Sequence, residues 1–206
     1  MAGLFVSFEG GEGSGKSTQI GRLAAHLRAG GRDPVITREP GGTPLAEGIR
    51  ALLLDPVLPP GALAEAFLME AARAEVVAHV IRPALAAGRV VLCDRYADST
   101  LVYQGAGRGL DRAMLRRLNE AATGGLTPDL TLLFDLDHAA GLARRQRAGE
   151  SNRLDQEPVE FHARVRAAYL ELARDEPARW VALDASLTPD ALEARVWGAV
   201  QARLPA

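Results

Sequence analysis

Residues 8–18 of this chain read Phe-Glu-Gly-Gly-Glu-Gly-Ser-Gly-Lys-Ser-Thr, and this stretch decides the fold. It matches the phosphate-binding loop pattern G-x-x-x-x-G-K-[ST], whose fixed positions are filled by Gly10, Gly15, Lys16 and Ser17. The apolar run at 4–8 predicts a strand before the loop, and apolar residues at helical spacing in 18–27 predict a helix after it. The pattern therefore stands between a strand and a helix, which is the context that phosphate binding requires.

A glycine-rich loop of this kind binds phosphate through its backbone. Glycine lets the chain curl closely around an anion, so that successive N–H groups and the N-terminus of the following helix point at it. We expect Lys16, the only lysine in the chain, to contact the β- and γ-phosphates of a nucleotide, and the Ser17 hydroxyl to help hold Mg²⁺. The expected ATP-binding residues of this loop are Gly10, Gly11, Glu12, Gly13, Ser14, Gly15, Lys16, Ser17 and Thr18.

The composition is that of a globular protein with no general affinity for nucleic acid. The chain has 206 residues, 48% of them hydrophobic, and a formal net charge of −2. This length suggests one domain, 1–206, and the charge gives no overall attraction to nucleic acid or to an anionic membrane. No run of 18 apolar residues predicts a membrane span, and Glu9 interrupts the first apolar stretch too early for a signal peptide. Because Cys93 is the single cysteine, we expect a reducing, cytoplasmic location.

Apolar runs alternate with helical patterns along the chain, which predicts an α/β fold. The expected strands are 4–8, 33–37, 89–94, 130–135 and 180–184. Their near-continuous apolar character is typical of parallel strands covered on both faces. The longest helical pattern spans 62–79, and its expected core contacts are Leu63, Ala66, Phe67, Ala74 and Val77. Asp111 and Asp137 are expected to cap later helices.

Two arginines are candidates for an anion site. Arg38 begins the loop Arg-Glu-Pro-Gly-Gly-Thr-Pro at 38–44, where a strand ends and ligands of open α/β sheets gather. The alternative for Arg38 is a surface ion pair with Glu39 or another acid. Arg73 lies on the long helix and either crosses into the site or faces water.

The strand at 89–94 ends in an acid and is followed by polar residues. Asp94 is placed to hold Mg²⁺ together with Ser17, in the manner of a Walker B acid, and the alternative role for it is a helix cap. Hydroxyl, amide and aromatic groups suited to a base and a sugar follow at Ser99, Thr100, Tyr103 and Gln104.

A cluster of arginines with Gly, Ser and Asn between them indicates a mobile segment at about 143–155. Its four candidate arginines are Arg144, Arg145, Arg147 and Arg153. Beside a phosphate-binding loop, we expect this segment to close as a lid, exclude water and bring guanidinium groups to the transferring oxygens. The alternative is a solvated helix end whose arginines pair with Glu150 and Asp155.

With these pieces in order, the sequence resembles the bacterial thymidylate kinase family over nearly its whole length. The motifs that carry the resemblance are 8–18, Thr-Arg-Glu-Pro-Gly-Gly-Thr at 37–43, Asp-Arg-Tyr at 94–96 with Ser99, Tyr-Gln-Gly at 103–105, the arginine lid, and Leu-Asp-Ala-Ser at 183–186. The resemblance implies a P-loop nucleoside monophosphate kinase fold: a five-stranded parallel sheet with helices on both faces and a small arginine-rich lid. It also implies a Mg²⁺-dependent transfer of the γ-phosphoryl group of ATP to dTMP, giving dTDP and ADP, by a homodimer.

The resemblance further implies roles for single side chains. Glu9 resembles the acid that faces the deoxyribose 3′-hydroxyl, and Arg38 and Arg95 resemble the pair that grips the dTMP phosphate. Because the loop has no arginine between its fixed glycines, the resemblance to one subtype implies that the catalytic arginine lies in the lid. The implied catalytic residues are Glu9, Lys16, Arg38, Arg95, Arg147 and Arg153. The implied dTMP-binding residues are Glu9, Arg38, Met69, Arg73, Arg95, Ser99, Thr100, Tyr103 and Gln104, and those added to the ATP site are Arg144 and Ser186.

Met69 departs from the family pattern, which usually has a phenylalanine stacking on thymine at this position. Because the stacking ring is absent, we expect weaker dTMP affinity. Methionine still packs against a π-face through its polarizable sulfur, so we expect no change in the base that is bound. Two alternatives use the same motifs: another monophosphate or deoxynucleoside kinase on this scaffold, and a nucleotide-binding switch. A second set of anion-gripping arginines argues against a nucleoside acceptor, and the lid argues against a switch.

Overall fold

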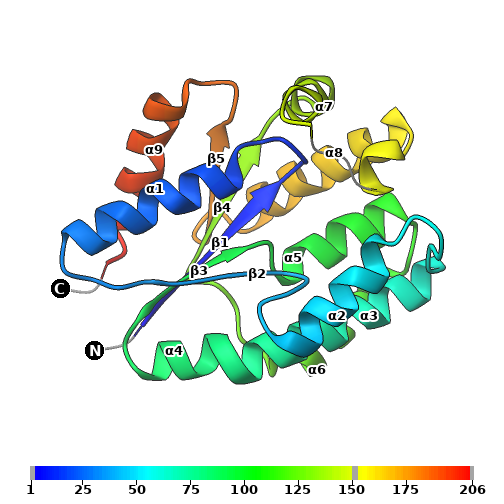
Figure 1. Ribbon diagram of the computed structural model, residues 1–206, viewed down its shortest axis with the longest axis horizontal. Helices are drawn as coiled ribbons and strands as arrows, with labels where there is room; N and C mark the ends of the chain where they lie inside the picture. Colours follow the sequence, from blue (N-terminus) through cyan, green and yellow to red (C-terminus); the bar gives the residue numbers. More distant parts are fainter. Residues whose placement is uncertain (1–2, 150–152, 205–206) are drawn as a thin grey trace.

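The computed structural model of this protein describes residues 3–149 and 153–204. At its centre lies a sheet of five parallel strands in the order β2-β3-β1-β4-β5 (Figure 1). The strands are β1 (Leu4–Gly10), β2 (Val35–Arg38), β3 (Val90–Asp94), β4 (Leu130–Asp135) and β5 (Trp180–Asp184). The five strands and the parallel α/β arrangement expected from the sequence are confirmed.

Helices cover both faces of this sheet (Figure 1). The α-helices are α1 (Lys16–Ala29), α2 (Pro44–Leu54), α3 (Ala62–Val76), α4 (Arg82–Ala86), α5 (Ala97–Thr100), α6 (Arg112–Thr123), α7 (His138–Arg147), α8 (Val159–Asp175) and α9 (Pro189–Gln201). Two π-helical segments, η1 (Val77–Ile81) and η2 (Leu101–Gly107), and a 3₁₀ turn, η3 (Arg153–Gln156), complete the described part. No helix in these described ranges is long and apolar enough to cross a membrane.

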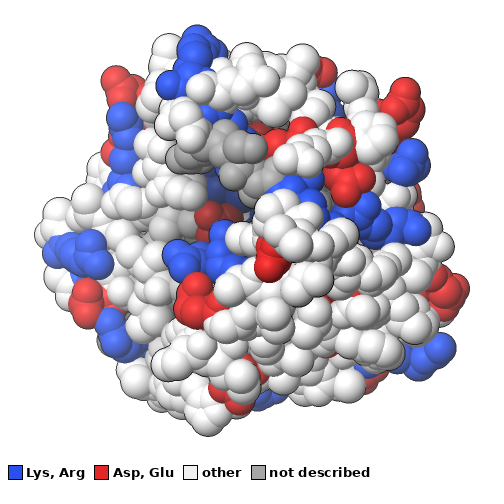
Figure 2. Space-filling model, turned by 45° about the vertical axis from the view of Figure 1, so that its right-hand side comes forward, with Lys and Arg blue, Asp and Glu red and all other residues white. Residues whose placement is uncertain are grey.

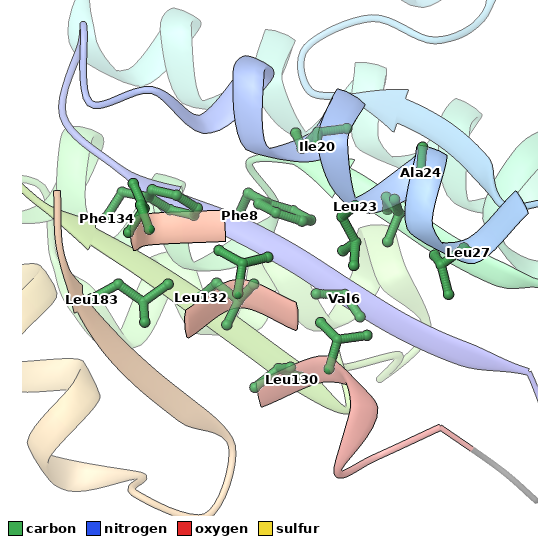
Figure 3. Close-up of a cluster of buried hydrophobic side chains, with 14 of the residues drawn as sticks. Val6, Phe8, Ile20, Leu23, Ala24, Leu27, Leu130, Leu132, Phe134 and Leu183 are labelled. Atoms are coloured by element: carbon green, nitrogen blue, oxygen red, sulfur yellow. The ribbon is translucent and has the colours of Figure 1, made fainter. Parts of the chain in front are cut away.

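Side chains of the central strand β1 alternate between the two faces of the sheet, and the two faces have different roles. Leu4, Val6 and Phe8 join a buried cluster with α1 and α9, in which Figure 3 shows the α1 side chains above β1 and β4. Phe5 and Glu9 have the opposite phase, because successive side chains of a strand point to opposite faces. Glu9 therefore meets α8 and the segment after β3, and the same strand supplies both the core and a buried acid.

The long helix differs from the sequence expectation in its packing. Ala66 and Val77 are buried as expected, but Leu63 is 45% exposed, Phe67 is 52% exposed and Ala74 is also exposed. The face that α3 buries carries charge as well as apolar groups, because it faces the site: its buried polar residues are Glu65, Glu70 and Arg73. A helical-periodicity analysis that assumes every buried position is apolar therefore predicts the wrong buried face for α3.

The helix also continues past residue 79, through Pro83. The Arg82 N–H donates to the Val77 carbonyl, an i→i−5 bond that widens the turn just before the proline. Such a π-helical turn lets the chain pass a residue that has no N–H to give. Further along, Asp111 and Asp137 accept hydrogen bonds from the backbone N–H groups of Met114 and Ala139, which confirms both as caps.

Candidate active site

The loop between β1 and α1 has the curled backbone that its glycines predict. Gly10, Gly13 and Gly15 have φ of 136°, 68° and 92°. At Gly13 space matters as much as φ, because a Cβ would lie 2.2 Å from the carbonyl oxygen of Gly141. The phosphate-binding loop therefore packs directly on the backbone of α7, the helix that leads into the expected lid.

Lys16 is held inside this loop. Its Nζ donates to the carbonyl oxygens of Gly10 at 3.2 Å and Gly11 at 3.0 Å, and lies 3.4 Å from the Ser14 hydroxyl. Burial, followed by the charge of Arg95, lowers the pKa of Lys16. The loop carbonyls therefore accept the N–H groups of Lys16 at the place where the loop curls inward.

A cavity of about 430 Å³ opens beside the loop. It is lined by loop residues, by α7 and by the turn after β5, and these residues include Gly13, Ser14, Gly15, Lys16, Ser17, Thr18, Arg144, Arg145 and Ala185. Arg144 donates to the carbonyl oxygen of Ala185 at 3.0 Å, so the expected ATP-site arginine meets the turn that contains Ser186. The Ser186 hydroxyl itself donates to Asp184.

Ser17, Asp94 and Arg38 line a neighbouring cleft of about 400 Å³. The Ser17 hydroxyl donates to Asp94 Oδ2 at 3.0 Å, although the two residues are 77 positions apart. Among the described residues, no group of three or more His, Cys, Asp or Glu could hold a metal ion. One hydroxyl and one carboxylate nevertheless fit Mg²⁺, which keeps several waters and takes other ligands from substrate phosphates. Asp94 is not a helix cap, since α5 is preceded by Tyr96.

A second cavity, of about 90 Å³, lies on the other side of the loop at Glu12. Its lining includes five of the expected dTMP-binding residues: Met69, Arg95, Ser99, Tyr103 and Gln104. Arg153 and Leu154, which belong to the expected lid segment, also line it. Figure 2 shows Lys and Arg side chains gathering with acidic ones around a hollow on this face of the molecule.

Arg95 occupies an unusual backbone position in this cavity. It is the only non-glycine residue with positive φ, 70°, in the described ranges, a conformation that costs a residue with a Cβ about 1 kcal/mol. Its guanidinium forms an ion pair with Glu12 at 2.6 Å and lies 4.8 Å from the centre of the Tyr103 ring. Burial would raise the pKa of Glu12, but Arg95, Lys16 and Arg145 outweigh it and lower that pKa to about 2.

Glu9 is fully buried at the base of the site. It accepts hydrogen bonds from the Tyr96 backbone N–H at 2.7 Å, the Ser99 hydroxyl at 2.6 Å and the Tyr169 hydroxyl at 2.8 Å. Burial, together with the charge of Asp98, raises the pKa of Glu9 to about 7. The carboxylate is thus held in place by three donors while its charge remains costly.

Four expected dTMP-binding residues do not line the second cavity: Glu9, which lies at its base, and Arg38, Arg73 and Thr100. Arg38 lies in the neighbouring cleft, where its Nη2 donates to both carboxylate oxygens of Glu47. Arg73 and Thr100 are fully buried, and Arg73 donates to the Thr100 hydroxyl at 3.0 Å. Arg73 also forms a 2.8 Å ion pair with Glu39, which lines the second cavity, so its guanidinium is already engaged by a residue of the cavity wall.

The lid arginines separate into two groups. Arg145 lines the cavity of about 430 Å³ and lies 3.5 Å from Glu12, whereas Arg147 is exposed and its Nε donates to the Ala143 carbonyl one turn earlier. Arg153 lines the second cavity and donates to Glu65. The expected lid segment 143–155 includes residues 150–152, which lie outside the described residues.

Sequence reasoning missed several residues of the site. Arg50 and Glu65 line the second cavity, and the Tyr169 hydroxyl contacts Glu9 and Ser99. Tyr169 also belongs to a buried hydrophobic cluster. Glu65 could be predicted as a site residue because it is a charged residue on the buried face of a helix. That prediction requires knowing which face of α3 is buried.

The sheet order, the phosphate-binding loop and the two cavities on its sides define a P-loop kinase of small nucleotides. The family model described as thymidylate kinase matches residues 8–196. The chain is 53% identical over 201 residues to a thymidylate kinase of Deinococcus radiodurans, with 98% of each chain covered. It is 54% identical over 198 residues to one of Thermomicrobium roseum, covering 95% of this chain and 93% of the relative.

A solved structure agrees with these sequence matches. The crystal structure of thymidylate kinase from Ehrlichia chaffeensis superimposes with a TM-score of 0.77 at 32% identity, covering 98% of this chain and 99% of that one. This chain therefore belongs to the thymidylate kinase family.

Proposed function

We propose that the two cavities beside the phosphate-binding loop are the donor and acceptor sites of one phosphoryl transfer. Family membership supports the reaction, ATP-dependent phosphorylation of dTMP to dTDP. The observation that carries the assignment of sites is their common wall: Glu12 lines one cavity and its neighbour Gly13 lines the other. Two nucleotides bound in these two cavities would therefore meet at Glu12 and Gly13.

The donor site holds ATP by its phosphates. Lys16 exchanges its loop carbonyls for the β- and γ-phosphate oxygens, and the loop N–H groups and the N-terminus of α1 add further positive potential. Arg144 and Arg145 lie across the cavity and stabilise charge on the transferring group. Ser17 and Asp94 would hold Mg²⁺, which would neutralise phosphate charge.

The acceptor site holds dTMP. Arg95 grips the acceptor phosphate, Glu9 receives the 3′-hydroxyl, and Met69 and Gln104 contact the base. These roles are supported by the position of the four side chains around one buried pocket or, for Glu9, at its base. No protein nucleophile is needed, because the acceptor phosphate is ionised near neutral pH and attacks directly. The chain acts mainly by holding two anions that would otherwise repel each other.

We further propose that residues 1–206 form one kinase domain with a lid at about 143–155, and that the enzyme is a cytoplasmic homodimer. Leu63 and Phe67 support a dimer, since they lie one helical turn apart on the exposed face of α3. The single buried thiol of Cys93 fits a reducing compartment. Light scattering after size exclusion tests the dimer: a monomeric mass at 50 μM protein would contradict it.

The function is tested by ADP release with ATP, Mg²⁺ and the acceptors dTMP, dUMP, dCMP, AMP and thymidine. We expect dTMP to be strongly preferred, with dTDP and ADP formed in equal amounts. A preference for thymidine would indicate a nucleoside kinase. ATP consumption that no acceptor accelerates would indicate a nucleotide-binding switch.

A further inference from the structure

One carboxylate ties the base end of the acceptor cavity to the lid. Glu65 lies on α3 one turn before Met69 and is 3% exposed. Its Oε1 accepts a hydrogen bond from Gln104 Nε2 at 2.8 Å, and its Oε2 accepts one from Arg153. Arg108 lies beside both oxygens, with Nε 3.3 Å from Oε1.

These cations keep Glu65 ionised. Burial would raise the pKa of Glu65, but the hydrogen bonds from Arg153 and Gln104 and the charge of Arg108 outweigh it and lower that pKa. An ionised carboxylate can only accept hydrogen bonds. The amide of Gln104 must therefore turn its NH₂ group toward Glu65, whichever way the amide would point otherwise.

The other end of the same amide is left open. Gln104 lines the acceptor cavity, and its Oε1 is buried without a hydrogen-bond partner among residues 3–149 and 153–204. A buried carbonyl oxygen without a partner favours a ligand that brings a donor. Thymine brings such a donor at N3–H, whereas a cytosine-type ring has a lone pair at N3, which would face the carbonyl oxygen and repel it.

We propose that Glu65 is a positioning residue that fixes the orientation of the Gln104 amide, and so makes the acceptor cavity select bases with an N3–H. The inference rests on the proposed place of the base beside Gln104. Glu65 itself does not touch the base: it acts through Gln104. Selection between thymine and cytosine rings is then decided by a charge on α3 that acts through Gln104 of η2.

The test compares dTMP with 5-methyl-dCMP, which has the same sugar, phosphate and methyl group and differs only in the N3–C4 edge. The readout is the ratio of kcat/KM for the two acceptors, because damage that is only structural lowers both values together. Glu65→Gln replaces the carboxylate by an amide that donates as well as accepts, so Gln104 is free to flip. We expect it to lower the dTMP preference by about tenfold or more.

Two variants control this result. Arg108→Gln removes another partner of Glu65 but leaves its bond to Gln104, and we expect the ratio to stay within about twofold of wild type. Gln104→Leu removes the amide, and adding Glu65→Gln to it should change the ratio no further, since both act through one group. If Glu65→Gln does not fold by circular dichroism, Glu65→Asp keeps the charge and should retain most of the preference.

The outcomes separate cleanly. A ratio unchanged in folded Glu65→Gln, or changed equally by Arg108→Gln, overturns the inference. Loss of the preference in Gln104→Leu but not in Glu65→Gln shows that the amide reads the base without help, and also overturns it. Failure of the wild type to phosphorylate dTMP refutes the proposed function instead, and that result is obtained before any variant is made.

Discussion

Arg73→Met is the substitution whose effect the structure defines most fully. The Arg73 side chain is 0% exposed and donates to Glu39 at 2.8 Å, Glu70 at 2.5 Å and Asn119 at 2.8 Å. Methionine has a similar length and flexibility, so the substitution removes charge and donors more than volume. It leaves the carboxylates of Glu39 and Glu70 buried without their cation.

The expected loss of stability is about 4 kcal/mol at pH 8, because removing one partner of a buried ion pair costs about 3–5 kcal/mol. The second carboxylate does not double this figure, since Glu39 can take up a proton. Burial already raises the pKa of Glu39 to about 7, against the opposing charge of Arg73. For a chain of this size, the loss corresponds to a fall in Tm of about 8–16 °C.

The loss should depend on pH. A carboxyl group whose folded-state pKa is raised contributes stability at low pH and loses it as pH rises through that pKa. Without Arg73 the pKa of Glu39 rises above 7, so at pH 6 the group is neutral in the folded variant and the cost is smaller. We expect Arg73→Met to lose about 1 kcal/mol less at pH 6 than at pH 8, because the pKa of Glu39 is already about 7 in the wild type and each pKa unit is worth about 1.4 kcal/mol.

The assay is urea unfolding followed by circular dichroism at pH 6 and pH 8, at one protein concentration. Arg195→Met, at an exposed position of α9, is the matched control and should change stability by less than about 0.5 kcal/mol. A triple variant that adds Glu39→Gln and Glu70→Gln should recover at least half of the loss. A loss below about 1 kcal/mol, or one that is equal at both pH values, refutes the reasoning.

Three further predictions concern activity. Met69→Phe should lower KM for dTMP by about 2–10-fold through ring stacking on thymine, and an unchanged KM in steady-state kinetics would contradict the assignment of Met69 to the base. Arg145→Met should lower kcat by about 100-fold while Arg147→Met changes it less than about threefold, because Arg145, unlike Arg147, lines the donor cavity; the reverse ranking would return the catalytic role to Arg147. KM for dTMP should rise as pH falls through about 7, where Glu9 gains a proton, and KM for 3′-deoxy-dTMP should show no such rise.

The local parts of the fold were predictable because their causes are local. The phosphate-binding loop, the five strands and the caps at Asp111 and Asp137 follow from residues that are neighbours in the chain. Turn geometry, capping and hydrophobic period are short-range effects, and they act on a few consecutive residues. The helix face at Leu63 and Phe67 could not be predicted in this way, because α3 buries charge toward the site.

By itself, the sequence determined the succession of strands and helices along the chain, the anion-binding loop and, through resemblance, the family. Only the tertiary structure decided which charges meet. It brought Ser17 to Asp94 across 77 residues, Glu65 to Gln104 across 39, and Arg145 rather than Arg147 to the loop. Such contacts depend on how helices pack on a sheet, and packing is set by the whole core at once. The sequence therefore shows that an arginine carries a positive charge, but the burial of the side chain and the distance to its partner decide what that charge does.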